Sequence, residues 1–361
     1  MIKRPWAGRT SPCPEGRSAH KGVRHRGSHQ RMRFLKRLAL ALLGTVYRRL
    51  GSKLRLHLGQ MPAVMRLYQR AIRSLLSAPA GDAGLLRASV GGFQMYVDAR
   101  EIRAGLFLGD YEPATTAVFE SLIAPGDTVV DIGAHWGYFT LLAARQCGEG
   151  GKVVAFEPDP RNYSILLRNV QANRLNNVSA LQAAVTDRTG EGTLHLASNS
   201  SMHSLYELGS DLRAGEVGVS CVTLDDLAEK VPIQPSLIKM DIEGGEPRAY
   251  AGMRSLLARF RRINMIVEFL PHYLGTEAAR AFLNTLFQSG FHVAIIDDRR
   301  YRVAAGSVDQ LLAKASEDEA DGYVSNLLCR RGDDSDSGAD PLVGMRRRHT
   351  LTHPLPKRAQ L

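Results

Sequence analysis

From Thr128 onward, short apolar runs alternate with longer amphipathic runs, and this alternation restricts the fold more than any other feature. The strand-like runs span residues 128–134, 152–157, 178–185, 236–242, 263–270 and 291–297. The helical runs between them span residues 138–146, 160–175, 246–260 and 277–290. Strands and helices that alternate in this way form a parallel sheet covered by helices on both faces. We therefore predict an α/β fold with a doubly wound, mostly parallel sheet. Before it, residues 85–99 predict a hairpin that turns at Gly91-Gly92, and a helix begins near Pro113.

The positive charge of the chain is confined to its ends. The formal net charge is +11, yet residues 1–57 hold 15 Lys/Arg and a single acid, and residues 330–361 add three net positive charges. Residues 58–329 hold 25 basic and 31 acidic residues, so the central part is mildly acidic. A polyanionic substrate is not implied, and we expect no specific nucleic-acid partner.

Composition also divides the chain into segments. Residues 1–31 predict a disordered basic arm, which a translation start at Met32 would leave out of the protein. Residues 32–84 predict a basic amphipathic helical segment, in which the apolar run 38–47 is too short for the roughly 20 residues that span a bilayer. Two interpretations remain open for residues 34–57, namely helices that cap the domain or peripheral contact with an anionic membrane. Residues 85–329 predict the folded domain, and residues 330–361 predict a disordered tail.

The cysteines point to a reducing compartment. They are widely spaced and show no CxxC pairing, which argues against a zinc site and a disulfide framework. We expect a cytoplasmic protein, with the inner face of the membrane as the site of any peripheral contact.

Chemically suggestive residues follow the ends of the predicted strands, where open α/β sheets bind their ligands. Asp131 ends the first of these strands, and Gly133 and Gly137 come directly after it. Gly133 lets a ligand approach the backbone, and Gly137 opens the following helix. Glu157 ends the second strand, where an acid accepts hydrogen bonds from the two ribose hydroxyls of an adenosine. The spacing therefore predicts a site for an adenosine-containing ligand.

Two cofactors carry such an adenosine. A dinucleotide needs the loop G-x-G-x-x-G so that its pyrophosphate can lie across the backbone. Here the loop reads G-A-H-W-G, and the side chains of His135 and Trp136 fill that space. S-adenosylmethionine (SAM) has no phosphate, and its ammonium group suits a loop that contains an aspartate. SAM is the predicted cofactor.

Four ordered motifs carry a resemblance to a known family. The segments DIGAHWGYFTL, VVAFEPDPRNYSILLRNVQANRLNNV, VTLDDL and LIKMDIEGGEPRAYAG resemble the FkbM-type methyltransferases over about residues 90–300. The resemblance implies a Rossmann-like, class I SAM-dependent methyltransferase fold, preceded here by N-terminal helices. It also implies O-methylation of a sugar, a glycan or another small hydroxylated metabolite, in polysaccharide or secondary-metabolite biosynthesis.

The same resemblance assigns the site residues. It places Asp241 and Glu243 at the reacting end of the SAM site, and it shows one departure, because His135 stands where the family usually has Asn. The cofactor-binding residues that it implies are Asp131, Gly133, Gly137, Tyr138, Glu157 and Asn162.

Methyl transfer to a hydroxyl is an in-line displacement that needs alignment and removal of a proton. Asp241 ends the fourth predicted strand, and Glu243 lies two residues on, so the two carboxylates face the same side. With His135, they are the catalytic candidates. A carboxylate at Asp241 fits a general base, a ligand for a divalent cation that orients a diol, or a group that holds SAM or the following turn. A third acid, Glu268, ends the fifth strand, and no metal site is assigned.

Two other functions remain open. The basic N-terminal segment and the departure at His135 are compatible with a membrane-associated binding or scaffold protein that keeps a vestigial SAM fold. An RNA methyltransferase is the third alternative, and the acidic central part argues against it. His203 lies in a polar stretch after the third strand, which fits either a substrate lid or an ordinary surface connection.

Overall fold

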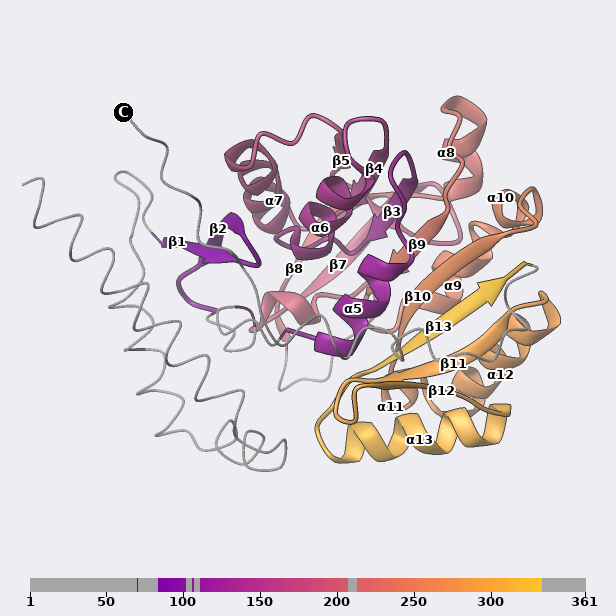
Figure 1. The fold of residues 1–361 in the computed structure, drawn as a ribbon. Helices are drawn as coiled ribbons and strands as arrows, with labels where there is room; N and C mark the ends of the chain where they lie inside the picture. Colours follow the sequence, from indigo (N-terminus) through magenta and orange to yellow (C-terminus); the bar gives the residue numbers. More distant parts are fainter. Residues whose placement is uncertain (1–69, 71–83, 102–105, 107–110, 207–212, 333–361) are drawn as a thin grey trace, which may run out of the picture.

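A computed structural model describes residues 70, 84–101, 106, 111–206 and 213–332 of the chain (Figure 1). The predicted basic arm 1–31, the segment 34–57 and the tail beyond residue 332 lie outside the described residues. Among the helices that the structure does describe, none is both long and apolar enough to cross a bilayer.

An eight-stranded sheet forms the centre of the fold. Its strands follow one another in the order β12-β11-β13-β10-β9-β3-β4-β5. The five strands from β10 to β5 run parallel, while β13 lies antiparallel between β10 and β11, and β12 pairs antiparallel with β11. This arrangement confirms the predicted Rossmann-like α/β fold with a mostly parallel sheet. The strands are β3 (Thr128–Ile132), β4 (Lys152–Phe156), β5 (Val178–Leu181), β9 (Leu237–Met240), β10 (Ile263–Phe269), β11 (His292–Asp297), β12 (Arg302–Ala305) and β13 (Ser325–Arg331).

Helices cover both faces of this sheet, and neighbouring residues of a buried strand face opposite cores. Val129 of β3 packs in a core that contains Phe119 and Phe139, whereas Val130 packs in a core that contains Phe282. The first core lies under α5 and α6, and the second lies under α9, α10, α12 and α13. The helices are α5 (Pro113–Ser121), α6 (Tyr138–Cys147), α7 (Pro160–Ala172), α8 (Leu224–Lys230), α9 (Glu246–Ala251), α10 (Arg254–Ala258), α11 (Pro271–Leu274), α12 (Thr276–Gln288) and α13 (Val308–Ala320).

Two predicted elements are divided in the structure. The expected strand 178–185 ends at Leu181, and Ala184–Val185 (β6) instead joins a separate sheet with β8 (Arg213–Val222) and β7 (Gly190–Ala197). The expected helix 246–260 breaks at Gly252, where an ideal Cβ would lie 2.0 Å from the carbonyl oxygen of Thr186. Contact between distant backbone segments, which no local pattern reports, causes this second break.

The predicted hairpin is present as β1 (Leu85–Val90) and β2 (Phe93–Asp98), which pair antiparallel and lie beside α7 in Figure 1. The buried amide of Asn169 on α7 accepts from the backbone N–H of Tyr96 at 2.6 Å and donates to its carbonyl at 3.0 Å. It also donates to the carbonyl of Trp136 at 2.8 Å. Asn173 repeats the pattern at Gln94, with distances of 2.9 and 2.8 Å. The two amides thus bind the free edge of β2 as a neighbouring strand would.

We expect Asn169→Ala to destabilise the protein by roughly 2–4 kcal/mol, because it leaves buried backbone groups of Tyr96 and Trp136 without partners. Urea unfolding followed by circular dichroism measures the change. Asn176→Ala is the matched control, since Asn176 is exposed. Equal unfolding free energies for the two variants would show that the amide does not anchor the hairpin.

Candidate active site

The register of the sheet brings the carboxyl ends of four strands into one row. Ile132 lies opposite Phe156 and Met240, and Met240 lies opposite Val267. The residues that come next on these strands are Gly133, Glu157, Asp241 and Glu268. All four line one cavity of about 710 Å³. The strand ends that the sequence singles out therefore meet at a single site.

Acidic side chains dominate this cavity. Among the described residues that line it, the side chains with a permanent positive charge are Lys239 and Arg299. An enclosed surface with this charge balance attracts a cationic ligand and repels a polyanion. The carboxylates along it are Glu112, Asp131, Glu157, Asp241, Glu243, Glu268 and Asp298.

Glu157 is held at one end of the row by backbone donors. Its Oε2 accepts from the backbone N–H of His135 at 2.7 Å, and its Oε1 accepts from that of Asp159 at 3.0 Å. Burial raises the pKa of Glu157 to about 8, although these N–H groups act in the opposite direction. Beside it, Gly133 has a φ of +82°, and a Cβ there would lie 1.9 Å from the carbonyl oxygen of Asp241. Only glycine fits between the two strand ends.

His135 belongs to the end of the cavity where Glu157 lies. Its ring nitrogen Nε2 lies 2.8 Å from Oγ of Ser200, and the ring is 4.4 Å from that of Trp136. Oγ of Ser200 in turn donates to Glu101 at 2.7 Å. These contacts fasten the short 3-10 helix η1 (Ser200–Met202) to the turn after β3. The arrangement assigns His135 a positioning contact on this side of the site.

Lys239 lies fully buried beneath the middle of the row. Its Nζ is 2.7 Å from Oδ2 of Asp241 and 4.4 Å from the centre of the Phe139 ring. Burial alone would lower the pKa of Lys239, but the charges of Asp241, Glu112 and Asp131 more than offset this and raise it. Lys239 therefore carries its charge inside the protein and neutralises part of the acidic cavity.

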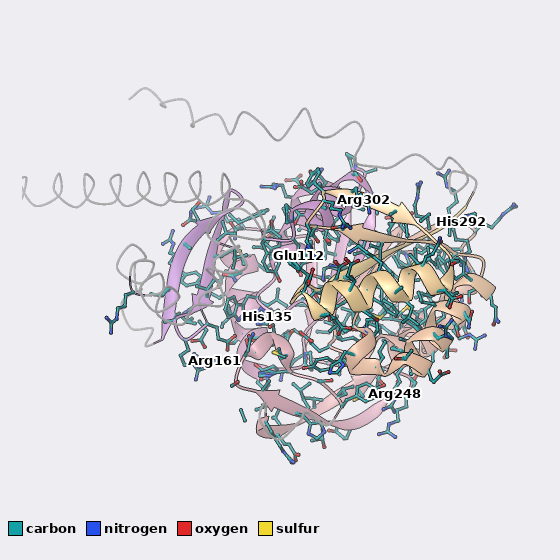
Figure 2. The ribbon with its side chains drawn as sticks, turned by 90° about the horizontal axis from the view of Figure 1, so that it is seen from below. Glu112, His135, Arg161, Arg248, His292 and Arg302 are labelled. Atoms are coloured by element: carbon teal, nitrogen blue, oxygen red, sulfur yellow. The ribbon has the colours of Figure 1, made fainter. Side chains whose placement is uncertain are left out.

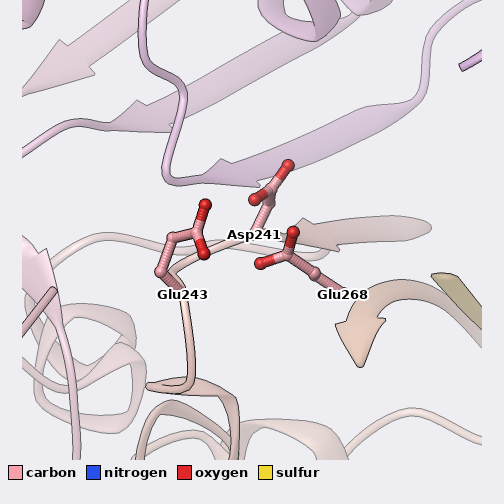
Figure 3. Close-up of side chains that lie close together, drawn as sticks. All are labelled: Asp241, Glu243 and Glu268. Atoms are coloured by element: carbon pink, nitrogen blue, oxygen red, sulfur yellow. The ribbon is translucent and has the colours of Figure 1, made fainter. Parts of the chain in front are cut away.

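The acids at the other end of the row are close together. One carboxylate oxygen each of Asp241, Glu243 and Glu268 lies within 4.8 Å of the others (Figure 3). Burial raises the pKa of Glu268 well above its ordinary value, and the charges of Asp241 and Glu243 add to the effect. Burial likewise raises the pKa of Glu112 to about 7, with Lys239 opposing the shift. Glu112 can therefore exchange a proton near neutral pH.

Backbone strain gathers at the same cavity. Glu112, His135 and Glu243 have φ angles of +41°, +51° and +52°, which non-glycine residues rarely adopt. All three line the cavity, and Figure 2 shows Glu112 and His135 nearer the middle of the molecule than Arg248 and His292. Strained residues that persist in a fold are typical of functional sites.

Most of the residues that the sequence assigns to the site line the cavity, but two do not. Gly137 faces Leu166, and the buried Asn162 accepts from the indole N–H of Trp136 at 3.1 Å. The residues that line the cavity are Asp131, Gly133, His135, Tyr138, Glu157, Asp241 and Glu243.

Sequence reasoning missed two further acidic residues that line the cavity, Glu112 and Asp298, and it gave no site role to Lys239. Oδ1 of Asp298 accepts from the backbone N–H groups of Ala114 and Thr115 at 2.6 and 3.1 Å, which caps α5 across the chain. A cap supplied from so far along the chain leaves no local signal. Lys239 stands two residues before the acid of the fourth predicted strand, and this spacing is the signal that could have revealed it.

Comparison with known families gives a match that spans this part of the chain. Residues 131–303 match the methyltransferase FkbM domain, a range that begins at Asp131 and contains the whole row of strand-end residues. Residues 131–303 of the chain form an FkbM-type methyltransferase domain. The predicted family is thereby confirmed.

The methyltransferase is similar to curated relatives over part of its length. It is 26% identical over 194 residues to Methyltransferase 1 of Beauveria bassiana (strain ARSEF 2860), covering 47% of this chain and 75% of that protein. It is 27% identical over 174 residues to the 31-O-demethyl-FK506 methyltransferase FkbM of Streptomyces tacrolimicus, covering 40% and 65% of the two chains. The O-methyltransferase from Bacillus cereus, solved in complex with SAH, aligns at 14% identity over 61% and 81% of the two chains with a TM-score of 0.38.

Lys239→Met tests the charge balance of the methyltransferase. Without the ammonium, the pKa of Asp131 should rise further in the folded state, above its value of about 4 in the unfolded chain. Folding then takes up protons, so stability is lost as pH rises through that interval. We expect a loss of about 3 kcal/mol or more at pH 8 and a smaller loss at pH 5, measured by urea unfolding.

The exposed Lys152→Met is the control for this experiment, because Lys152 carries the same charge at the solvent-facing start of β4. It should show little loss at either pH. An equal loss at pH 5 and pH 8 in Lys239→Met would mean that the lysine acts by packing alone.

Proposed function

We propose that this methyltransferase transfers the methyl group of SAM to a hydroxyl of a sugar or another small hydroxylated molecule. The observation that carries the proposal is the acidic row along one cavity, with Glu157 at one end and Asp241, Glu243 and Glu268 at the other. A methyl donor that carries a ribose and a positive charge matches both ends of the row, with the ribose at Glu157 and the positive charge at the other acids.

The residues present fit SAM. Glu157 has the position and the acceptor atoms to bind ribose hydroxyls, and the apolar Phe156 and Ala183 line the cavity near it. Because Gly133 has no Cβ, the backbone carbonyl of Asp241 can lie directly against the loop that follows β3. Asp131 and Asp241 supply negative charge for the ammonium and the sulfonium of the donor. The turn containing His135 closes this side through its bond to Glu157.

When bound, SAM supplies a methyl group on a positively charged sulfur. In transfer to a hydroxyl, the C–O bond would form as the C–S bond breaks with its electron pair left on sulfur, and a carboxylate of this chain would take the hydroxyl proton. Glu112 is suited to take this proton, because its pKa of about 7 matches the working range of a general base. Asp241, bonded to Lys239, is better suited to hold the negative charge that balances the sulfonium.

The acidic cavity favours a small neutral acceptor over the other candidates. Seven carboxylates around the cavity oppose entry of an RNA phosphate backbone, so we propose no specific nucleic-acid partner. A scaffold protein with a vestigial fold has no use for buried carboxyl groups of raised pKa. We accordingly propose that the protein acts in the cytoplasm on a small-molecule or glycan acceptor.

Glu157→Ala tests the proposed donor site. We expect isothermal titration calorimetry to show S-adenosylhomocysteine (SAH) binding by the wild type and a loss of at least about tenfold in affinity in the variant, because the buried acceptor for the two ribose hydroxyls is removed. Release of SAH from SAM, measured with a panel of sugars that carry neighbouring hydroxyls, reports turnover.

Glu149→Ala is the control, since Glu149 is exposed at the other end of α6. Its affinity for SAH should match that of the wild type. Absence of SAH binding in the wild type, or equal binding in Glu157→Ala, would contradict the proposed function.

The raised pKa of Glu157 predicts a pH dependence of donor binding. Ribose hydroxyls donate to the ionised carboxylate, and the free protein holds Glu157 protonated below about pH 8. Affinity for SAH should therefore increase as pH rises from 6 to 8, by up to about tenfold per unit, and then level off. Calorimetry at each pH measures it.

Glu157→Gln separates this titration from those of its neighbours. The groups that face Glu157 include Asp159, which also lies 4.0 Å from Nε2 of His203. These groups remain in the variant, so the difference between the two pH profiles isolates Glu157. Parallel profiles would mean that another group controls binding.

A further inference from the structure

The three carboxylates at the reacting end of the cavity form a compact group whose side chains converge (Figure 3). Asp241 and Glu243 follow β9, and Glu268 lies on the adjacent parallel strand β10. One oxygen from each lies within 4.8 Å of the other two. Because the strand register sets their spacing, the group is built into the sheet and does not depend on a surface loop alone.

Glu268 supplies an independent observation. The residue is 5% exposed, and its Oε2 is buried without a hydrogen-bond partner in the part of the chain that the structure describes. A buried carboxylate oxygen without a donor is strongly unfavourable unless a cation or a proton satisfies it. The carboxyl group of Glu268 points toward those of Asp241 and Glu243, which offer acceptors of the same kind.

Among the residues that the structure describes, Lys239 is the lysine that lines this cavity, and it does not balance the group. Nζ of Lys239 binds Oδ2 of Asp241, and its charge is also shared with Glu112 and Asp131. Three carboxylates and one shared ammonium leave a net negative charge at the cavity wall. A divalent cation supplies the missing charge.

We propose that Asp241, Glu243 and Glu268 bind one hard divalent cation of the Mg²⁺, Mn²⁺ or Ca²⁺ class. Carboxylate oxygens are the ligands that these ions prefer. Two oxygens on opposite sides of a Ca²⁺ ion are about 4.6–5.2 Å apart, given Ca–O distances of about 2.3–2.6 Å. The observed limit of 4.8 Å fits this range, while Mg²⁺ requires the carboxylates to move slightly inward.

The site leaves room for an acceptor. The Asp241 side chain is 24% exposed and Glu243 is half-buried, so the cation faces the cavity on one side. Its remaining positions are open to water or to two neighbouring oxygens of a bound molecule. This extension rests on the proposed function, and it identifies the acceptor class as molecules that chelate through adjacent oxygens, such as vicinal diols.

The test uses Mn²⁺ and the full chain after treatment with a chelator. Electron paramagnetic resonance measures free Mn²⁺ during a titration, and we expect one bound ion per chain. Glu268→Gln keeps the shape of the side chain and should weaken binding by at least about tenfold. Asp241→Asn should do the same, and calorimetry with Ca²⁺ and Mg²⁺ compares the ions.

Glu317→Gln is the matched control, because Glu317 is exposed on α13 and its removal deletes one negative charge far from the cavity row. It should bind Mn²⁺ like the wild type. Urea unfolding without metal checks the fold, and Glu268→Gln should be at least as stable as the wild type because a buried acid is lost. Reduced metal binding in a fully folded variant then reports the site itself.

Each outcome decides the proposal. Absence of Mn²⁺ binding, or binding that is equal in Glu268→Gln, Asp241→Asn and Glu317→Gln, overturns it. SAH binding is measured on the same metal-free samples. SAH binding without metal binding overturns the cation site and keeps the proposed function, while metal binding without SAH binding does the reverse.

Discussion

The ion pair between Lys239 and Asp241 is the interaction on which the arrangement of the site depends. Lys239 is buried in the central part of the sheet, and its charge acts on Asp131 from β3, on Glu112 from the start of α5 and on Asp241 from the end of β9. Three elements that are far apart in the sequence can bring carboxylates together because one ammonium lies among them. Without it, their mutual repulsion would add to the desolvation of each group.

Lys239 neutralises only part of the negative charge of the cavity, and the negative charge that remains can bind a cationic ligand. Seven carboxylates line the cavity, and several of them have pKa values raised by burial toward or above neutrality. Such groups destabilise the folded state as they ionise. A bound cationic ligand reduces this destabilisation. The proposed donor is a cation, and so is the proposed metal ion. Negative charge that destabilises the empty fold therefore favours binding at both ends of the row.

The part of the site that depends on strand ends could be predicted from the sequence. Strand-like runs locate Asp131, Glu157 and Asp241, and parallel register then brings them together. Residues placed by distant contacts could not be predicted. Glu112 reaches the cavity because Asp298, 184 positions further along the chain, caps α5 through the backbone N–H of Ala114. No sequence pattern within either segment predicts this hydrogen bond. The division of the 178–185 run between two sheets has the same origin, because β6 finds its partner in β8.

Local pattern also fails to say which side of a turn a residue faces. Asn162 is the third residue of α7. Its side chain accepts from the indole N–H of Trp136 and does not line the cavity, although its motif suggested contact with the cofactor. His135 shows the opposite case. The resemblance implies Asn at this position, and the structure holds His135 at a φ of +51° with its backbone N–H donating to Glu157. Asn and His are both enriched among residues with such left-handed backbone geometry. The constraint at this position is therefore on the backbone turn that supports Glu157, and an imidazole can satisfy it without taking part in the chemistry.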